Sequence, residues 1–232
     1  MNLLDATEQG LRLVFTGDTA LWQIIGVSLR VSLLALLLSA PVCVAAGFWL
    51  AMTEFRGRRS LVIAVQSLQA FPTVVVGLML YLLLSRHGPL GSWGILFTEN
   101  AMIIGQAIIA APVLVAASLA AIQAADPRVH ETALSLGATR LRAALTTLRE
   151  VRFGVMGGLF NAFGRVISEV GCAMMVGGNI AGETRTLPTA IALETQKGDF
   201  AQGIAQGLVL MGFAFGINFL FAILLQGRGG QR

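Results

Sequence analysis

Five long apolar stretches, separated by shorter polar segments, make up most of this 232-residue chain. A helix that crosses a bilayer needs about 20 mostly apolar residues, because the hydrocarbon core is about 30 Å thick. All five stretches reach that length: residues 21–52, 61–84, 101–122, 153–180 and 204–225. The pattern therefore predicts an all-α polytopic membrane protein with five transmembrane helices.

The composition favours the same class of protein. Hydrophobic residues make up 56% of the chain and charged residues only 12%, whereas soluble domains carry about 25% charged residues. No polar turn accompanies Pro41, so residues 21–52 are expected to form one tilted or kinked helix rather than two short spans. We expect residues 1–232 to form a single transmembrane domain.

The basic residues indicate how the chain is oriented. If the five spans alternate in direction, ten of the sixteen Arg and Lys residues lie on one side and four on the other, with Arg30 and Arg165 inside spans. Cytoplasmic loops carry the excess of positive charge in membrane proteins. The C-terminus is therefore predicted to be cytoplasmic and the N-terminus to lie outside. Asp5 and Glu8 stand where a cleaved signal peptide would carry positive charge, so the first residues are expected to form an interfacial segment.

The longest hydrophilic segment on the cytoplasmic side, residues 126–150, is predicted to fold as two short helices. Asp126 and Pro127 are typical of a helix start, with a carboxylate cap followed by proline at the first helical position. Gly137 favours a left-handed turn that ends the first helix, and Thr139 can cap the second. Apolar residues follow a helical spacing in both helices: Val129, Ala133 and Leu136 in the first, and Leu141, Leu145 and Leu148 in the second.

This cytoplasmic segment is not expected to bind nucleic acid, because both of its ends are attached to membrane spans within a few residues. An amphipathic hairpin that lies on anionic membrane lipid is one interpretation. The other, which we favour, is a peg that inserts into a groove of a cytoplasmic partner protein. A stripe of small apolar residues with one carboxylate, Glu131, suits such insertion.

The chain lacks the residues for ATP hydrolysis. A phosphate-binding loop needs Gly-Lys followed by Ser or Thr, but the only lysine, Lys197, follows a glutamine and precedes a glycine. His87 and His130 are predicted to lie on opposite sides of the membrane, so they cannot form one catalytic site. Cys43 and Cys172 fall in apolar stretches and lack metal-ligand or disulfide spacing. We expect no catalytic residue, no metal site and no cofactor on this chain.

The fourth apolar stretch contains small and polar residues at regular intervals. They follow one another at steps of four and three, the spacing of a helix-packing face: Gly157, Asn161, Gly164, Ser168 and Gly171. We expect this face to meet another helix or a second copy of the chain.

Arg165 and Glu169 lie one helical turn apart beside this face. Arg165 is about 18 Å along the span at ~1.5 Å per residue, and an isolated charge near the middle of a membrane costs at least about 2.5–3.5 kcal/mol. The two side chains therefore form an ion pair that orients the helix, or they line a substrate path together with Asn161 and Ser168. Both alternatives stay open at this point.

A segment rich in small, hydroxyl and amide side chains, residues 177–200, is predicted to lie on the outer side. Asn179, Thr184, Arg185 and Thr186 supply hydrogen-bond donors and one positive charge, which is chemistry suited to the passage of an oxyanion. An ordinary solvated loop would have the same composition, so this segment has two interpretations.

The cytoplasmic segment carries a recognisable motif. Glu131-Thr132-Ala133, followed after three residues by Gly137-Ala138, resembles the EAA loop of ABC-importer permeases, with Thr132 in place of the middle alanine. The resemblance implies a coupling helix that docks on a separate ATP-binding subunit, which would bind ATP and Mg. It assigns coupling to these residues: Glu131, Ala133, Leu136, Gly137 and Ala138.

Further motifs resemble the tungstate branch of the molybdate/tungstate permease family. They are E-V-G at 169–171, G-G-N-I at 177–180, T-R-T-L at 184–187, A-I-x-L-E-T at 190–195, and the N-terminal residues 16–38. The resemblance implies a type I ABC-importer permease fold in a bacterial inner membrane. It also implies a homodimer, two ATP-binding subunits and an extracytoplasmic substrate-binding protein.

The expected function is transport of an oxyanion, with tungstate as the first choice and molybdate or sulfate as alternatives. An ATP-independent transporter or channel is a second hypothesis. Secondary transporters are often built from two repeats, and five spans do not divide evenly. A membrane scaffold without transport activity is a third hypothesis, and it predicts that loss of the chain leaves anion uptake unchanged.

Overall fold

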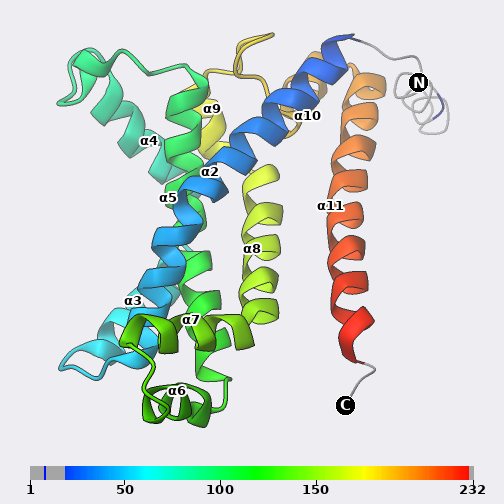
Figure 1. Cartoon of the computed structure of the whole chain (residues 1–232). Coiled ribbons are helices and arrows are strands. Elements are labelled where there is room, and N and C mark those ends of the chain that lie inside the picture. The colour runs from blue at the N-terminus through cyan, green and yellow to red at the C-terminus, as the bar shows by residue number, and fades with distance from the viewer. Residues whose placement is uncertain (1–7, 9–18, 230–232) are drawn as a thin grey trace.

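In the computed structural model, which describes residue 8 and residues 19–229, two long helices form the framework of the fold. Helix α2 (Thr19–Met52) and helix α5 (Glu99–Gln123) pack against each other along much of their length (Figure 1). Their close approach requires a residue without a side chain, because a Cβ at Gly47 would lie 2.7 Å from the Cβ of Ser118. Helix α2 continues through Pro41, as predicted.

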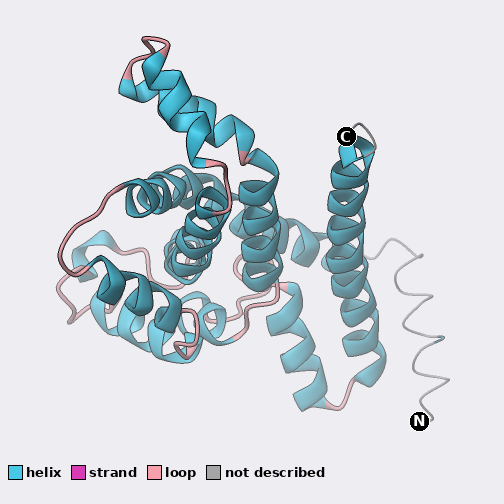
Figure 2. Cartoon of the chain, turned by 90° about the horizontal axis from the view of Figure 1, so that it is seen from below, coloured by secondary structure: helices cyan, strands magenta, loops and turns pink. Residues whose placement is uncertain are grey.

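The other elements are helices arranged around this framework, and Figure 2 shows no strand among the residues that the structure describes. They are α3 (Arg58–Leu68), α4 (Thr73–Leu84), the short 3-10 helix η1 (Gly91–Trp93), α6 (Pro127–Ser135), α7 (Arg140–Glu150), α8 (Arg152–Ile167), α9 (Gly171–Gly177), α10 (Leu187–Lys197) and α11 (Phe200–Gly229). The predicted all-α class is confirmed.

Two of the predicted spans are sharply bent. Helices α3 and α4 meet at 94° across residues 69–72, and α8 and α9 meet at 59° across residues 168–170. The prediction of one continuous helix over residues 61–84, and of another over 153–180, is therefore wrong. Pro72 explains the first bend, because proline has no backbone N–H and disfavours helical backbone in the residue before it.

Side chains that bond to the backbone accompany the second bend. The hydroxyl of Ser168 donates to the backbone oxygens of Gly164 at 2.7 Å and Arg165 at 3.2 Å, and such bonds within a helix often bend it. At the start of α9, the N–H of Cys172 donates to Glu169 Oε1 at 3.0 Å, so the carboxylate just before the helix bonds to its first turn.

By length and composition, the described residues contain two to four candidate membrane spans. Helices α2 and α5 qualify alone, and each bent pair qualifies if it counts as one span. Helix α11 coincides with the fifth predicted span, and its described apolar part, Phe200–Gly216, is shorter. The five-span topology stays a prediction.

The two ends of the molecule carry different elements (Figure 1). Helices α6 and α7 lie at the same end as the last turns of α11, whereas α9, α10 and the start of α2 lie at the opposite end. This arrangement agrees with a hairpin and a C-terminus on one side of a membrane. The predicted interfacial segment, apart from Glu8, lies outside the described residues.

Helix α10 is fastened to the start of α2. The N–H of Leu187 donates to Ser28 Oγ at 2.8 Å, and the Ser28 hydroxyl donates to the backbone oxygen of Ile24 at 2.8 Å. Leu187 and Ala190 are fully buried in an apolar cluster with Leu21 and Ile24. This packing fixes the end of the 178–186 loop that leads into α10.

Candidate functional site

The α6–α7 hairpin has the caps that the sequence predicts. Asp126 Oδ1 accepts a hydrogen bond from the N–H of Arg128 at 2.9 Å, and Thr139 Oγ1 accepts one from the N–H of Arg142 at 3.4 Å. Gly137 has a φ of +85°, a conformation that disfavours residues with a Cβ. The helix, glycine turn and second helix are therefore confirmed as local structure.

Leucine side chains are exposed at the tip of the hairpin. Leu136 is 83% exposed and Leu141 is 70% exposed, and Leu134 and Leu145 are also exposed. The predicted stripe of α6 is divided, because Ala133 is half-buried while Leu136 points into solvent. A strongly exposed leucine on a short, capped helix is suited to insertion into an apolar groove.

The opposite side of the hairpin holds α6 and α7 together. The hydroxyl of Thr147 donates to the backbone oxygen of Ala143 at 3.0 Å, so it accepts from His130 Nδ1 at 3.2 Å. The His130 ring also lies 6.3 Å from the ring of Phe48 in α2. These contacts link the hairpin to the end of α2 and give His130 a structural role that the sequence did not indicate.

The five proposed coupling residues surround the Gly137 turn. Glu131 is exposed, and it lines a cavity of about 250 Å³ together with Asp126 and His130 beneath the end of α2. The N–H of Ala138 donates to the backbone oxygen of Ala133 at 3.0 Å, which closes the turn. Glu131 and Ala133 thus lie in α6, and Leu136, Gly137 and Ala138 lie in the turn that follows it.

A polar cleft follows the last turns of α8. Its volume is about 510 Å³, and its lining consists of Phe160, Asn161, Gly164, Arg165, Ser168 and Glu169. We call it the α8 cleft. Asn161, Arg165 and Ser168 are exposed and Glu169 is buried. The structure thus brings the four predicted residues of this span together on one surface.

Arg165 and Glu169 do not form the ion pair that was one of the two alternatives, within the part of the chain that the structure describes. Arg165 instead donates from Nη2 to the backbone oxygen of Gln69 at 3.2 Å. Glu169 accepts the bond from Cys172 N–H that begins α9. Arg165 therefore joins the bend between α3 and α4 to the bend between α8 and α9.

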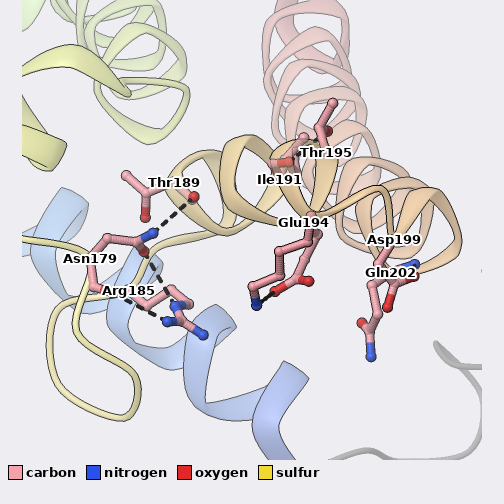
Figure 3. Close-up of polar contacts among 9 residues, drawn as sticks. Asn179, Arg185, Thr189, Ile191, Glu194, Thr195, Asp199 and Gln202 are labelled. Carbon is pink, nitrogen blue, oxygen red and sulfur yellow. Dashed lines mark hydrogen bonds and ion pairs between the residues drawn. The ribbon is translucent and has the colours of Figure 1, made fainter.

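The loop before α10 is held by its own polar side chains (Figure 3). Asn179 Nδ2 donates to the backbone oxygen of Thr189 at 3.3 Å, and Arg185 donates to Asn179 Oδ1 and to the Asn179 backbone oxygen, both at 3.3 Å. Asn179 has a φ of +52°, so these bonds stabilise an uncommon backbone conformation. Asn179 and Arg185 are half-buried and lie beside each other at the α10 end of the molecule.

Thr184 and Thr186 have structural roles in the same loop. Both are buried. The hydroxyl of Thr184 donates to the backbone oxygen of Gly177 and accepts from the N–H of Ile180, and Thr186 forms a capping box with Thr189 at the start of α10. Their hydroxyls are occupied inside the loop, and the half-buried Asn179 and Arg185 are the less enclosed of the four predicted residues.

Two polar contacts between distant elements could not be found from the sequence. The bond from Arg165 to the backbone oxygen of Gln69 could not be predicted, because a main-chain acceptor is present at every position and no side chain marks it. Arg30 forms an ion pair with Glu99 at 2.7 Å between α2 and α5. Arg30 is a lone arginine inside an apolar stretch, which indicates that it has a polar partner, but the sequence does not identify that partner as Glu99.

The chain is similar to known membrane-transport proteins over most of its length. Residues 43–228 match the family described as binding-protein-dependent transport system inner membrane component. The chain belongs to this family. It is a multi-pass inner-membrane permease subunit and not an enzyme, and ATP hydrolysis takes place on a separate subunit.

Two relatives within this family are similar along almost the whole chain. A probable anion ABC transporter permease protein of Haloferax volcanii is 42% identical over 225 residues, which cover 92% of this chain and 95% of the relative. The tungstate uptake system permease protein TupB of Campylobacter jejuni is 40% identical over 218 residues, which cover 94% of this chain and 91% of the relative.

A solved structure confirms the permease fold. A bacterial ABC transporter involved in the import of the acidic polysaccharide alginate superposes with a TM-score of 0.71 at 19% sequence identity. The match covers 90% of this chain and 82% of the other. At this identity the likeness concerns the fold, and the ABC-importer permease architecture is therefore established.

Proposed function

We propose that this permease moves tungstate into the cytoplasm. The observation that carries the substrate is the 40% identity to TupB of Campylobacter jejuni over 94% of the chain. The α8 cleft supports an anionic substrate, because it presents an exposed arginine within a candidate membrane span. An arginine in a membrane span faces protein or water, and it often marks an ion or substrate path.

A homodimer would turn this open cleft into a closed path. If a second copy packs against α8, the Asn161, Arg165 and Ser168 side chains of both copies would face a shared passage. Gly164 supports such packing, because a Cβ at this position would meet no atom within 4 Å in the single chain. Asn179 and Arg185 would then line the outer mouth of the passage.

Two ATP-binding subunits, which hold ATP and Mg, would drive transport through the α6–α7 hairpin. Leu136 would insert into a groove of each ATP-binding subunit, and His130 would transmit its movement to α7 and α2. Closure of the ATP-binding pair would bias the two permease copies toward an outward-open state, and ATP hydrolysis would reset them. A substrate-binding protein would deliver the anion at the α10 end.

Uptake by the reconstituted complex tests this function. Proteoliposomes that contain the permease and its ATP-binding subunits are supplied with the substrate-binding protein and labelled tungstate. Accumulation that needs both internal ATP and the binding protein is the expected result. Accumulation without ATP would instead support the ATP-independent transporter, and no accumulation of any oxyanion would support the scaffold.

Molybdate is the main alternative substrate. The molybdenum transport system permease protein ModB of Escherichia coli is 33% identical over 178 residues, which cover 73% of this chain. Uptake of labelled tungstate in the presence of excess molybdate or sulfate separates the alternatives. Equal competition by either anion would refute a tungstate-specific permease while leaving an oxyanion permease in place.

A further inference from the structure

The α8 cleft contains a carboxylate, which is unexpected in a passage for anions. Glu169 lines the cleft together with Arg165 and is 8% exposed. Among the described residues, no basic side chain lies within ion-pair distance of this carboxylate. A negative charge beside an anion site weakens anion binding by repulsion. The Glu169 carboxylate is therefore expected to have a function in this cleft.

The position of the Glu169 carboxylate is fixed by the fold. Its Oε1 atom accepts the Cys172 N–H at 3.0 Å, at the bend between α8 and α9. This bond keeps the carboxylate at the bend, and Arg165 points to the backbone oxygen of Gln69 instead. The guanidinium charge is thus not neutralised by its neighbour one turn away.

The cleft also contains donors for an anion. A guanidinium has five N–H donors, and within the described residues Arg165 donates to the backbone oxygen of Gln69 alone. Asn161 is exposed in the same cleft, and its amide has no hydrogen-bond partner in the described part of the chain. Ser168 has its hydroxyl hydrogen directed to backbone oxygens of α8, so it contributes less.

We propose that Arg165 and Asn161 bind the transported oxyanion in the α8 cleft and that Glu169 weakens this binding, so that the anion is released in every cycle. This inference rests on the proposed function of the chain as an oxyanion permease. Since repulsion by a fixed negative charge increases with the charge of the ligand, Glu169 weakens binding of a divalent oxyanion more than binding of a univalent one of the same shape.

Tungstate and perrhenate are suitable probes, because both are tetrahedral oxyanions and they carry two and one negative charges. Their equilibrium binding is measured on the permease with its ATP-binding subunits in lipid nanodiscs. In Glu169→Gln, the amide oxygen can still accept the Cys172 N–H while the charge is removed. The expected result is about tenfold tighter binding of tungstate, a smaller gain for perrhenate, and slower uptake of tungstate in proteoliposomes.

Glu54→Gln is the matched control. Glu54 is exposed in the turn between α2 and α3 and does not line the cleft. This variant should bind both anions as the wild type does. Tungstate affinity that rises equally in Glu54→Gln and Glu169→Gln would overturn the inference, because the change would then reflect the net charge of the complex.

Asn161→Asp provides a second variant that does not depend on the bend. Asn161 is exposed, and its replacement adds a carboxylate of nearly the same size to the cleft. Tungstate binding should weaken at least about tenfold, and perrhenate binding should weaken less. Unchanged tungstate binding in Asn161→Asp, or in an assembled Glu169→Gln complex, would overturn the inference. Wild-type complexes that take up no oxyanion would instead refute the proposed function.

Discussion

Replacement of Leu136 by alanine is expected to weaken the attachment of the ATP-binding subunit without affecting the fold of the permease. The change removes about three methylene equivalents at ~0.8 kcal/mol each. Leu136 is 83% exposed in the single chain, so almost all of that area becomes buried when the hairpin docks. The expected loss is about 2 kcal/mol of binding free energy, or roughly a 30-fold higher Kd.

The assay is a titration of the purified ATP-binding subunit against permease in nanodiscs. Leu82→Ala serves as the control, because Leu82 is 58% exposed on α4 and lies outside the hairpin. That control should leave the Kd unchanged. A Kd for Leu136→Ala within twofold of the wild-type value would refute the assignment of Leu136 as the inserted residue. Equal losses in both variants would show that the effect is not local to the hairpin.

Three further substitutions test individual contacts. Gly137→Val should destabilise the hairpin by about 1–2 kcal/mol, because residue 137 has a φ of +85°. Coupled ATPase activity should fall, and normal ATPase activity in the assembled complex would contradict the role of the turn. Gly47→Leu should destabilise the permease by at least about 1–3 kcal/mol, because a Cβ there would lie 2.7 Å from the Cβ of Ser118; an unchanged thermal unfolding temperature would contradict the close packing. Thr184→Val should lower the stability by about 1–3 kcal/mol, because it removes a buried hydroxyl that donates to the backbone oxygen of Gly177 and accepts from the N–H of Ile180. The control Thr195→Val, at an exposed position on α10, should leave the unfolding temperature at the wild-type value.

Local chemistry allowed several elements to be predicted from the sequence. The α6–α7 hairpin was predictable because Asp126, Gly137 and Thr139 each act within a few residues of their own position. Continuity of α2 through Pro41 was predictable because no polar turn accompanies the proline. The polar face of α8 followed from helical spacing alone.

The bends and the contacts between distant elements were harder to predict from the sequence. Hydropathy is the same for a straight and a bent apolar stretch, so residues 61–84 and 153–180 looked continuous. Pro72 was a signal for the first bend, but it could equally have marked a kink in one span. The second bend depends on hydroxyl and carboxylate bonds of Ser168 and Glu169 whose geometry a sequence does not contain.

The contact between Arg165 and position 69 has a consequence for the divergence of this chain. The acceptor is a main-chain oxygen 96 positions away, and every amino acid provides that atom. Residue 69 can therefore drift in identity while the bond persists, whereas residue 165 must retain a long side chain with a donor. The two bends can therefore stay joined through substitutions at residue 69, but not through loss of the donor at residue 165.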